Sequence, residues 1–166
     1  MASKRIPQLL SASLLVPLLV HAAGEQTKVG NIQVSVTIVG ECEVFTPQPL
    51  SFGTLGATFP TKAAQSLINV NCSANTPYTI ALNNGQNGNN ASDRKLKSGT
   101  ELLPYGLFSD AAHGKVWGDG TSGSLLVSGV GTGVSQAITV YGQLPKPQSN
   151  PKPGTYADTV TATLIY

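Results

Sequence analysis

Gly154-Thr155-Tyr156-Ala157-Asp158-Thr159-Val160-Thr161-Ala162-Thr163-Leu164-Ile165-Tyr166 is the last stretch of the sequence, and it decides the fold. The segment is β-branched, rich in threonine and free of helix signals, which predicts a β-strand over residues 156–166. We expect no further strand to cover its outer side. The sequence therefore predicts a β-sheet with an open edge.

A second strand pattern lies near the N-terminus, in residues 32–38. Apolar and polar side chains alternate there, and four branched aliphatic residues share one face: Ile32, Val34, Val36 and Ile38. A spare strand and an open edge together favour assembly by strand exchange between molecules. A strand that pairs within its own molecule has the same pattern, so the residues alone leave both arrangements open.

Residues 1–22 have the features of a secretory signal peptide. A basic start precedes an apolar stretch at residues 9–20, and small residues follow at Ala22 and Ala23. The apolar stretch is shorter than the roughly 20 residues of a membrane-spanning helix. We therefore expect export without a membrane span, with cleavage after Ala22 or after Ala23.

Charge and cysteine content narrow the class of protein further. Without Lys4 and Arg5, eight of the ten basic residues remain against eight acidic ones, and no basic cluster is present. Binding to nucleic acid is therefore not expected. Cys42 and Cys72 are the only cysteines, and in an exported protein such a pair normally forms a disulfide. We expect this disulfide, with two buried free thiols as the alternative.

Short apolar runs separated by turn-rich breaks cover the rest of the chain, which is typical of an all-β sandwich. The runs are residues 65–72, 78–82, 103–108, 124–128, 134–144 and 156–166. No sustained helical period occurs beyond the signal peptide, so we expect little helix.

The sequence indicates no catalytic, cofactor or metal site. His113 is the one sure histidine of the exported chain, and neither a second ligand at metal-binding spacing nor a recognisable nucleophile accompanies it. We therefore expect no enzyme activity. Trp117 is expected to cover one end of the core, although a tryptophan can also stack on a sugar ring.

The order of short motifs after Cys42 resembles the spore coat protein U domain, the fold family of archaic chaperone-usher pilins. The motifs are Phe52-Gly53-Thr54-Leu55, Val70-Asn71-Cys72, Thr76-Pro77-Tyr78-Thr79-Ile80, Arg94 with Leu96, Leu103-Pro104-Tyr105-Gly106-Leu107-Phe108-Ser109-Asp110, Trp117-Gly118, Thr139-Val140-Tyr141-Gly142-Gln143-Leu144-Pro145 and Gly154-Thr155-Tyr156-Ala157-Asp158-Thr159-Val160. Leu96, Phe108 and Gln143 depart from residues common in the family, and none of these departures concerns assembly.

The resemblance implies an incomplete immunoglobulin-like β-sandwich that lacks its last strand, over residues 41–166, preceded by a donor-strand extension at residues 23–40. In such pilins a periplasmic chaperone first lends the missing strand, and the N-terminal strand of the next subunit later supplies it. The donor residues implied here are Ile32, Val34, Val36 and Ile38. The edge that the chaperone and then the donor strand would contact carries Val160, Ala162, Leu164 and Tyr166.

The function implied by the resemblance is a structural subunit of a surface pilus that contributes to adhesion and biofilm formation. Its expected partners are the periplasmic chaperone, an outer-membrane usher and other copies of itself or related pilins. Its expected location is the cell surface, after passage through the periplasm. Two alternatives remain: a monomeric secreted carbohydrate-binding β-sandwich that uses Trp117, Tyr105 and the asparagine-rich loop at 83–90, and a coat or matrix protein.

Overall fold

The computed structural model describes residues 24–166, so the expected signal peptide lies outside the described residues. Within the described part every regular element is a β-strand, and the predicted all-β class is confirmed. The strands are β1 (Cys42–Pro47), β2 (Lys62–Cys72), β3 (Pro77–Leu82), β4 (Lys95–Ser98), β5 (Glu101–Pro104), β6 (Gly106–Phe108), β7 (Val127–Val130), β8 (Gln136–Leu144) and β9 (Ala162–Ile165).

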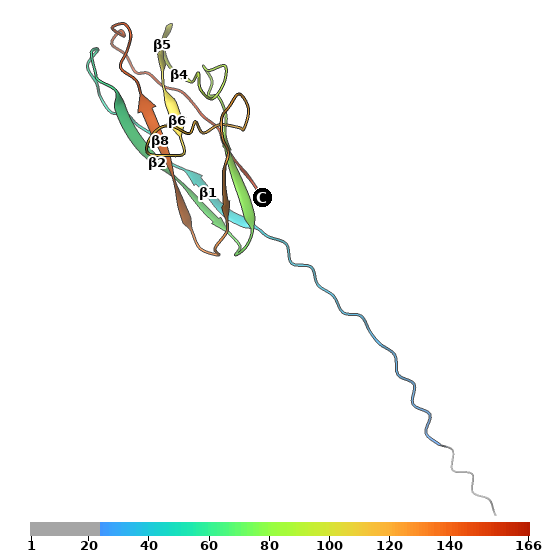
Figure 1. Cartoon of the computed structure of the whole chain (residues 1–166). Coiled ribbons are helices and arrows are strands. Elements are labelled where there is room, and N and C mark those ends of the chain that lie inside the picture. The colour runs from blue at the N-terminus through green and yellow to red at the C-terminus, as the bar shows by residue number, and fades with distance from the viewer. Residues whose placement is uncertain (1–23) are drawn as a thin grey trace, which may run out of the picture. The chain divides into compact units, whose positions relative to one another are not determined.

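The strands form two main antiparallel sheets and one small one. The larger sheet has the order β1-β2-β8-β6, the second has the order β7-β3-β9, and β4 pairs with β5 in a two-stranded sheet. In Figure 1 the layer that contains β2 and β8 lies on one side, and β3, in light green, lies on the other. The chain ends beside β3 because β9 pairs with it, with Leu164 opposite Ile80.

The core fills the space between these two layers. Along β2 the side chains of Ile68, Val70 and Cys72 are buried while their neighbours are more exposed, as the two-residue period of a strand requires. Tyr78 and Ile80 on β3 face them from the second sheet. The sandwich is thus built from one apolar face of each sheet.

Arg94 is fully buried at the end of β3, although it carries a charge. Its guanidinium donates hydrogen bonds to the carbonyl oxygens of Asn83 at 2.6 and 3.0 Å, Leu82 at 3.2 Å and Ala91 at 3.2 Å. These carbonyl groups lie where β3 ends and the next loop begins, so Arg94 satisfies backbone acceptors that would otherwise be buried without partners. Burial lowers the pKa of the guanidinium, and the nearby acidic groups oppose this shift.

β1, β4, β7 and β9 differ from the sequence prediction. β1 and β4 were not predicted, because CEVFTP and KLKS hold few apolar residues. The strand predicted over 156–166 is only four residues long as β9, since β3 provides a partner only from Ala162 onward. The run predicted at 124–128 becomes a strand only at Val127, where β3 pairs with it.

The segment before β1 has no regular structure in the described residues, and the three sheets contain no residue before Cys42. The chain divides into two units at Val36 and Thr37. In the first unit, the side chains of Ile32, Val34 and Val36 are 88 %, 90 % and 84 % exposed. The alternating pattern of this segment therefore has no strand partner in the described chain.

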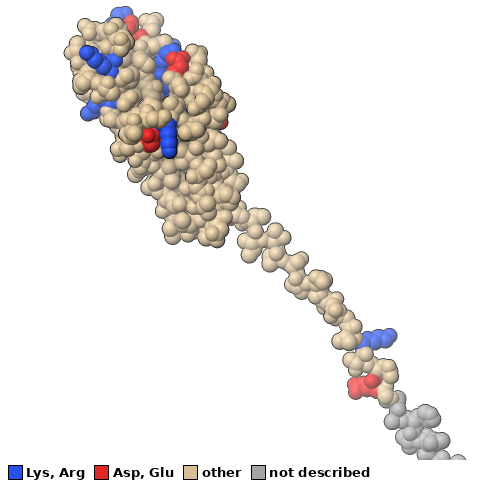
Figure 2. Space-filling model, in the orientation of Figure 1, with Lys and Arg blue, Asp and Glu red and all other residues tan. Residues whose placement is uncertain are grey.

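Charged side chains are sparse on the surface and of both signs. On the face drawn in Figure 2, Lys, Arg, Asp and Glu gather on one half of the domain, and the other half is nearly free of them. This face shows no continuous basic patch. Among the described residues, no helix has the length and apolar character needed to cross a membrane.

Candidate functional site

A groove of about 1110 Å³ lies between the two main sheets. Residues 47–57, which follow β1, form one side of the groove, and residues 151–162, which lead into β9, form the other. Its floor is apolar and is contributed by both sheets and by the small sheet: Ile68, Leu82, Leu96, Leu103, Leu107, Val140 and Leu144. The groove is thus lined by side chains that belong to the core or pack against it.

The side formed by the C-terminal segment has strand-like alternation. The side chains of Tyr156, Asp158, Val160, Ala162 and Leu164 are half-buried, and each residue between them is exposed. The alternation begins six residues before β9 itself. This segment therefore has one inward face, and the part of that face from Tyr156 to Ala162 lines the groove.

The same inward-facing residues have backbone groups that point away from β3. The Asn83 N–H donates to the Thr161 carbonyl oxygen at 3.0 Å, so Thr161 directs its backbone toward β3. Backbone direction alternates along a strand of an antiparallel pair, so the N–H and C=O groups of Val160, Ala162 and Leu164 point to the opposite side. That side is the open edge of the three-stranded sheet.

The groove does not extend along the whole of β9. β1 pairs with residues 68–72 of β2, and Phe45 on β1 and Leu164 on β9 both pack against the core. Leu164 does not line the groove, whereas Ala162 does. The open part therefore ends near Ala162.

Asp158 connects three elements at the groove. Its carboxylate accepts hydrogen bonds from the Tyr105 hydroxyl at 2.7 Å, the Gln86 N–H at 2.9 Å and the Asn87 side-chain amide at 3.1 Å. Burial of Tyr105 and its hydrogen bond to Asp158 raise the pKa of the phenol well above its ordinary value. These contacts hold the C-terminal segment against the 83–90 loop.

Two further contacts fix the outer rim of the groove. Lys97 on β4 and Ala157 exchange backbone hydrogen bonds of 2.9 and 3.1 Å. Lys152 forms an ion pair of 2.6 Å with Glu101, and its carbonyl oxygen accepts a hydrogen bond of 3.0 Å from the Tyr156 hydroxyl. The rim is thus tied to the small β4-β5 sheet.

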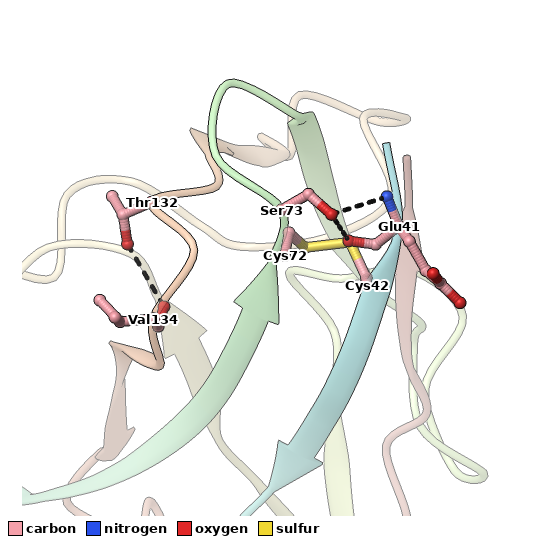
Figure 3. Close-up of a disulfide and its surroundings, with 6 residues drawn as sticks. All are labelled: Glu41, Cys42, Cys72, Ser73, Thr132 and Val134. Atoms are coloured by element: carbon pink, nitrogen blue, oxygen red, sulfur yellow. Dashed lines mark hydrogen bonds between the residues drawn. A yellow bond between two sulfur atoms is a disulfide. The ribbon is translucent and has the colours of Figure 1, made fainter. Parts of the chain in front are cut away.

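The expected disulfide joins Cys42 and Cys72, which are opposite each other on β1 and β2. Figure 3 shows the Ser73 side chain beside this bond, turned toward Glu41. The Ser73 hydroxyl donates to the Glu41 carbonyl oxygen at 3.1 Å and accepts from the Glu41 N–H at 3.3 Å. One residue earlier, a Cβ at Gly40 would overlap the side chain of Thr76, so only glycine fits. The start of the domain is therefore held on the turn after β2.

The predicted edge residues fall into three groups. Val160 and Ala162 line the groove, and Leu164 packs against the core outside it. Tyr166 is 62 % exposed and lies at a separate hollow of about 390 Å³, which residues 38–40 and 73–77 also line. Sequence reasoning missed Tyr156 and Asp158, although the same two-residue alternation extends back to them.

The two aromatic residues proposed for sugar binding are buried. Trp117 is fully buried, and its indole N–H donates to the Ile80 carbonyl oxygen at 3.0 Å. Tyr105 is also buried. His113 packs edge-on against Phe108, with ring centroids 5.2 Å apart. Within residues 24–166 no group of three metal-ligating side chains is found.

Comparison with known proteins decides the family. The model of the Spore Coat Protein U domain matches residues 28–163. The chain belongs to the Spore Coat Protein U domain family. This family is structural, and the chain is not an enzyme. Curated proteins include no match to the chain.

A solved structure with the same fold is the CsuC-CsuE chaperone-tip adhesion subunit pre-assembly complex, from the archaic chaperone-usher Csu pili of Acinetobacter baumannii. A chain of that complex is 28% identical to this Spore Coat Protein U domain protein, with a TM-score of 0.58. The match covers 78% of this chain and 40% of the other, so this chain spans less than half of that neighbour's length.

Proposed function

We propose that this protein is a structural subunit of a surface pilus, assembled through the chaperone-usher pathway by donor-strand exchange. In this proposal the sandwich over residues 41–166 lacks one strand, which would lie between the 47–57 and 151–162 segments. A chaperone fills the groove first, and the residue 23–40 extension of another copy or a related pilin, carrying Ile32, Val34, Val36 and Ile38, replaces it at an outer-membrane usher. The fibre then reaches the cell surface.

One observation carries the proposal: an apolar groove beside an open sheet edge, in a chain that also has an unpaired apolar segment. Core side chains such as Ile68 and Val140 line the groove, and the edge offers unpaired backbone groups at Val160 and Ala162. A strand with branched aliphatic residues on one face fits this site. Its backbone can form hydrogen bonds with the open edge, and its aliphatic side chains can fill the apolar groove. Each aliphatic side chain that becomes fully buried contributes about 1.5–3 kcal/mol.

The family and the solved neighbour support a chaperone as the first partner. The neighbour is a complex between a pilus chaperone and a subunit before assembly. An open groove and an open sheet edge also make a free subunit prone to aggregation, because strands of other chains can pair with the edge. We therefore propose that a periplasmic chaperone covers the groove until the next subunit arrives.

The decisive experiment compares fibres made by the wild-type chain and by the variant Val34→Asp/Val36→Asp. The wild-type polymer should appear as a ladder on an unheated denaturing gel and collapse to monomer on boiling. The variant should give monomer only, since the groove would have to bury two unpaired carboxylates, at several kcal/mol each. The matched control is Gln33→Asp/Ser35→Asp, which adds the same charge to the opposite face and should keep the ladder.

Two outcomes would contradict the proposal. A ladder that persists in Val34→Asp/Val36→Asp would mean that these residues are not the donor face. A wild-type chain that is monomeric when exported together with its chaperone and usher would remove strand exchange altogether. Adhesion and biofilm formation follow in the proposal from display of the fibre, and loss of surface attachment in the Val34→Asp/Val36→Asp strain tests them.

A further inference from the structure

We infer that the two ends of the domain form a charge-complementary contact between consecutive copies of this chain in the fibre. Glu41 and Glu43, at the base of one copy, lie against Lys62 and Lys146 of the copy that receives its extension. This inference rests on the proposed strand exchange. It concerns the contact between neighbouring domains, outside the groove.

The base of the domain, where the extension leaves it, has only acidic charge. We define the base as residues 37–44, 70–77, 126–138 and 164–166. These segments meet at one end of the sandwich, because a disulfide joins β1 to the end of β2 and the Asn75 N–H donates to the Gly131 carbonyl oxygen at 2.9 Å. Glu41 and Glu43 are the only charged side chains in these segments, and both are exposed.

The backbone of Glu41 is fixed on the domain, so its side chain starts from a defined place. The Glu41 N–H and carbonyl oxygen are both hydrogen-bonded to the Ser73 hydroxyl, and the Ser73 N–H donates to the same carbonyl oxygen at 2.8 Å. Figure 3 shows the Glu41 carboxylate directed away from Ser73 and from the disulfide. Within residues 24–166, neither Glu41 nor Glu43 forms an ion pair. Both carboxylates are therefore available to another chain.

The opposite end of the domain is rich in lysine. We define this lysine end as residues 54–62, 95–104 and 143–157, and its charged residues are Lys62, Lys95, Lys97, Glu101, Lys146 and Lys152. Lys95 is paired with Asp93 at 3.0 Å, and Lys152 is paired with Glu101 at 2.6 Å. The remaining lysines of this end are exposed and form no ion pair within the described part of the chain. The lysine end therefore has excess positive charge.

Lys62 and Lys146 are neighbours at the lysine end. Lys62 is opposite Leu144 in the β2-β8 pair, and the Lys146 N–H donates to the Thr61 hydroxyl at 3.2 Å. Strand β2 runs from Lys62 to Cys72, so the two ends are about 33 Å apart at about 3.3 Å per residue. This distance is several times the Debye length of about 8 Å at physiological ionic strength. The charges at the two ends of one copy therefore do not neutralise each other.

The groove reaches the lysine end and not the base. Residues 54–57 and 151–157 line it together with Leu96 on β4, and its lining includes no residue of the base. Glu41 follows Ile38, the last aliphatic residue of the donor face, by three positions, which span at most about 11 Å. A donor with Ile38 in the groove therefore keeps its own base close to the lysine end of the acceptor.

Charge favours this arrangement over its reverse. A donor base placed at the acceptor's base would bring the glutamates of both copies together, whereas at the lysine end the same glutamates meet Lys62 and Lys146. Exposed ion pairs contribute little to affinity. They do steer the encounter, and like charges disfavour the wrong orientation. The contact therefore favours head-to-tail addition of each copy.

The experiment treats assembled fibres with a water-soluble carbodiimide, which joins a carboxylate and a lysine amine in contact through an amide bond. The wild-type ladder should then survive boiling, and peptide mass spectrometry should find Glu41 or Glu43 joined to Lys62 or Lys146. Reversal of one end alone, by Glu41→Lys/Glu43→Lys or by Lys62→Glu/Lys146→Glu, should remove the boiling-resistant ladder. Both reversals in one chain should restore it, because a carboxylate again faces an amine.

Without carbodiimide, the wild-type chain and the combined reversal should both form the ladder that collapses on boiling, because the extension and the groove are unchanged. Three outcomes would overturn the contact while leaving strand exchange in place: a treated wild-type ladder that collapses on boiling, cross-links found only at other residues, or a combined reversal that does not restore the cross-link. The absence of any ladder from the untreated wild-type chain would instead remove strand exchange, and the contact with it.

Discussion

Removal of the disulfide between Cys42 and Cys72 is expected to destabilise the domain strongly. The bond closes a loop with a sequence separation of 30 residues. The chain-entropy relation gives about 3 to 4 kcal/mol for a loop of this length, through the greater freedom of the unfolded chain. Cys72 is fully buried, so Cys42→Ala/Cys72→Ala is the suitable variant, because alanine adds no polar group to the core.

The measurement is urea unfolding of the exported chain, followed by tryptophan fluorescence of the buried Trp117. A domain of this size loses roughly 1 to 3 kcal/mol per molar urea, so the midpoint should fall by about 1 to 4 M. Reductant should lower the wild-type midpoint to that of the variant and leave the variant unchanged. This control separates the covalent bond from the loss of two sulfur atoms.

The reasoning would be refuted by a loss of stability below about 1 kcal/mol with an unchanged dependence on urea. In that case the unfolded chain would already be restricted near these residues, or β1 would contribute little to the domain. An unchanged wild-type midpoint in reductant would have the same meaning, provided that free thiols are detected.

Two further changes test the buried polar groups. Arg94→Lys should lower the free energy of unfolding in urea by about 2 to 4 kcal/mol, because an ammonium cannot reach the carbonyl groups of Leu82, Asn83 and Ala91 together. A free energy of unfolding equal to that of the wild-type chain would contradict this. Tyr105 has a raised pKa in the folded chain, so unfolding should become easier as the pH rises above about 10, where the unfolded phenol ionises first. Tyr105→Phe should make the free energy of unfolding fall less steeply with pH. The remaining fall would come from Tyr78, because burial raises the pKa of that phenol as well. An unchanged pH dependence in Tyr105→Phe would show that Tyr105 does not cause the loss of stability.

Much of the fold could be predicted because most strands bury one face. In β2, β3 and β8 buried side chains alternate with more exposed ones over much of the strand, and the predicted runs fall on them. β1 and β4 could not be found in this way. β4 is held by pairing with β5 rather than by an apolar face, and β1 is only partly buried at the edge of its sheet.

The groove could be predicted only in part, for a related reason. The sequence shows which residues of the C-terminal segment share a face, and Val160 and Ala162 do line the groove. It does not show that the groove reaches Ala162 but not Leu164, because that depends on how distant segments of the chain pack together. For the same reason the sequence does not show that Tyr156 and Asp158 line the groove.

The position of the disulfide has a mechanical consequence. The chain enters the domain at Cys42, and the bond to Cys72 connects that entry point directly to β2, which pairs with both β1 and β8. A pull on the N-terminal extension therefore passes through a covalent bond into the middle of the larger sheet. β1 cannot be peeled from its neighbour starting at that end, so the domain should resist tension applied through its extension until a whole sheet shears.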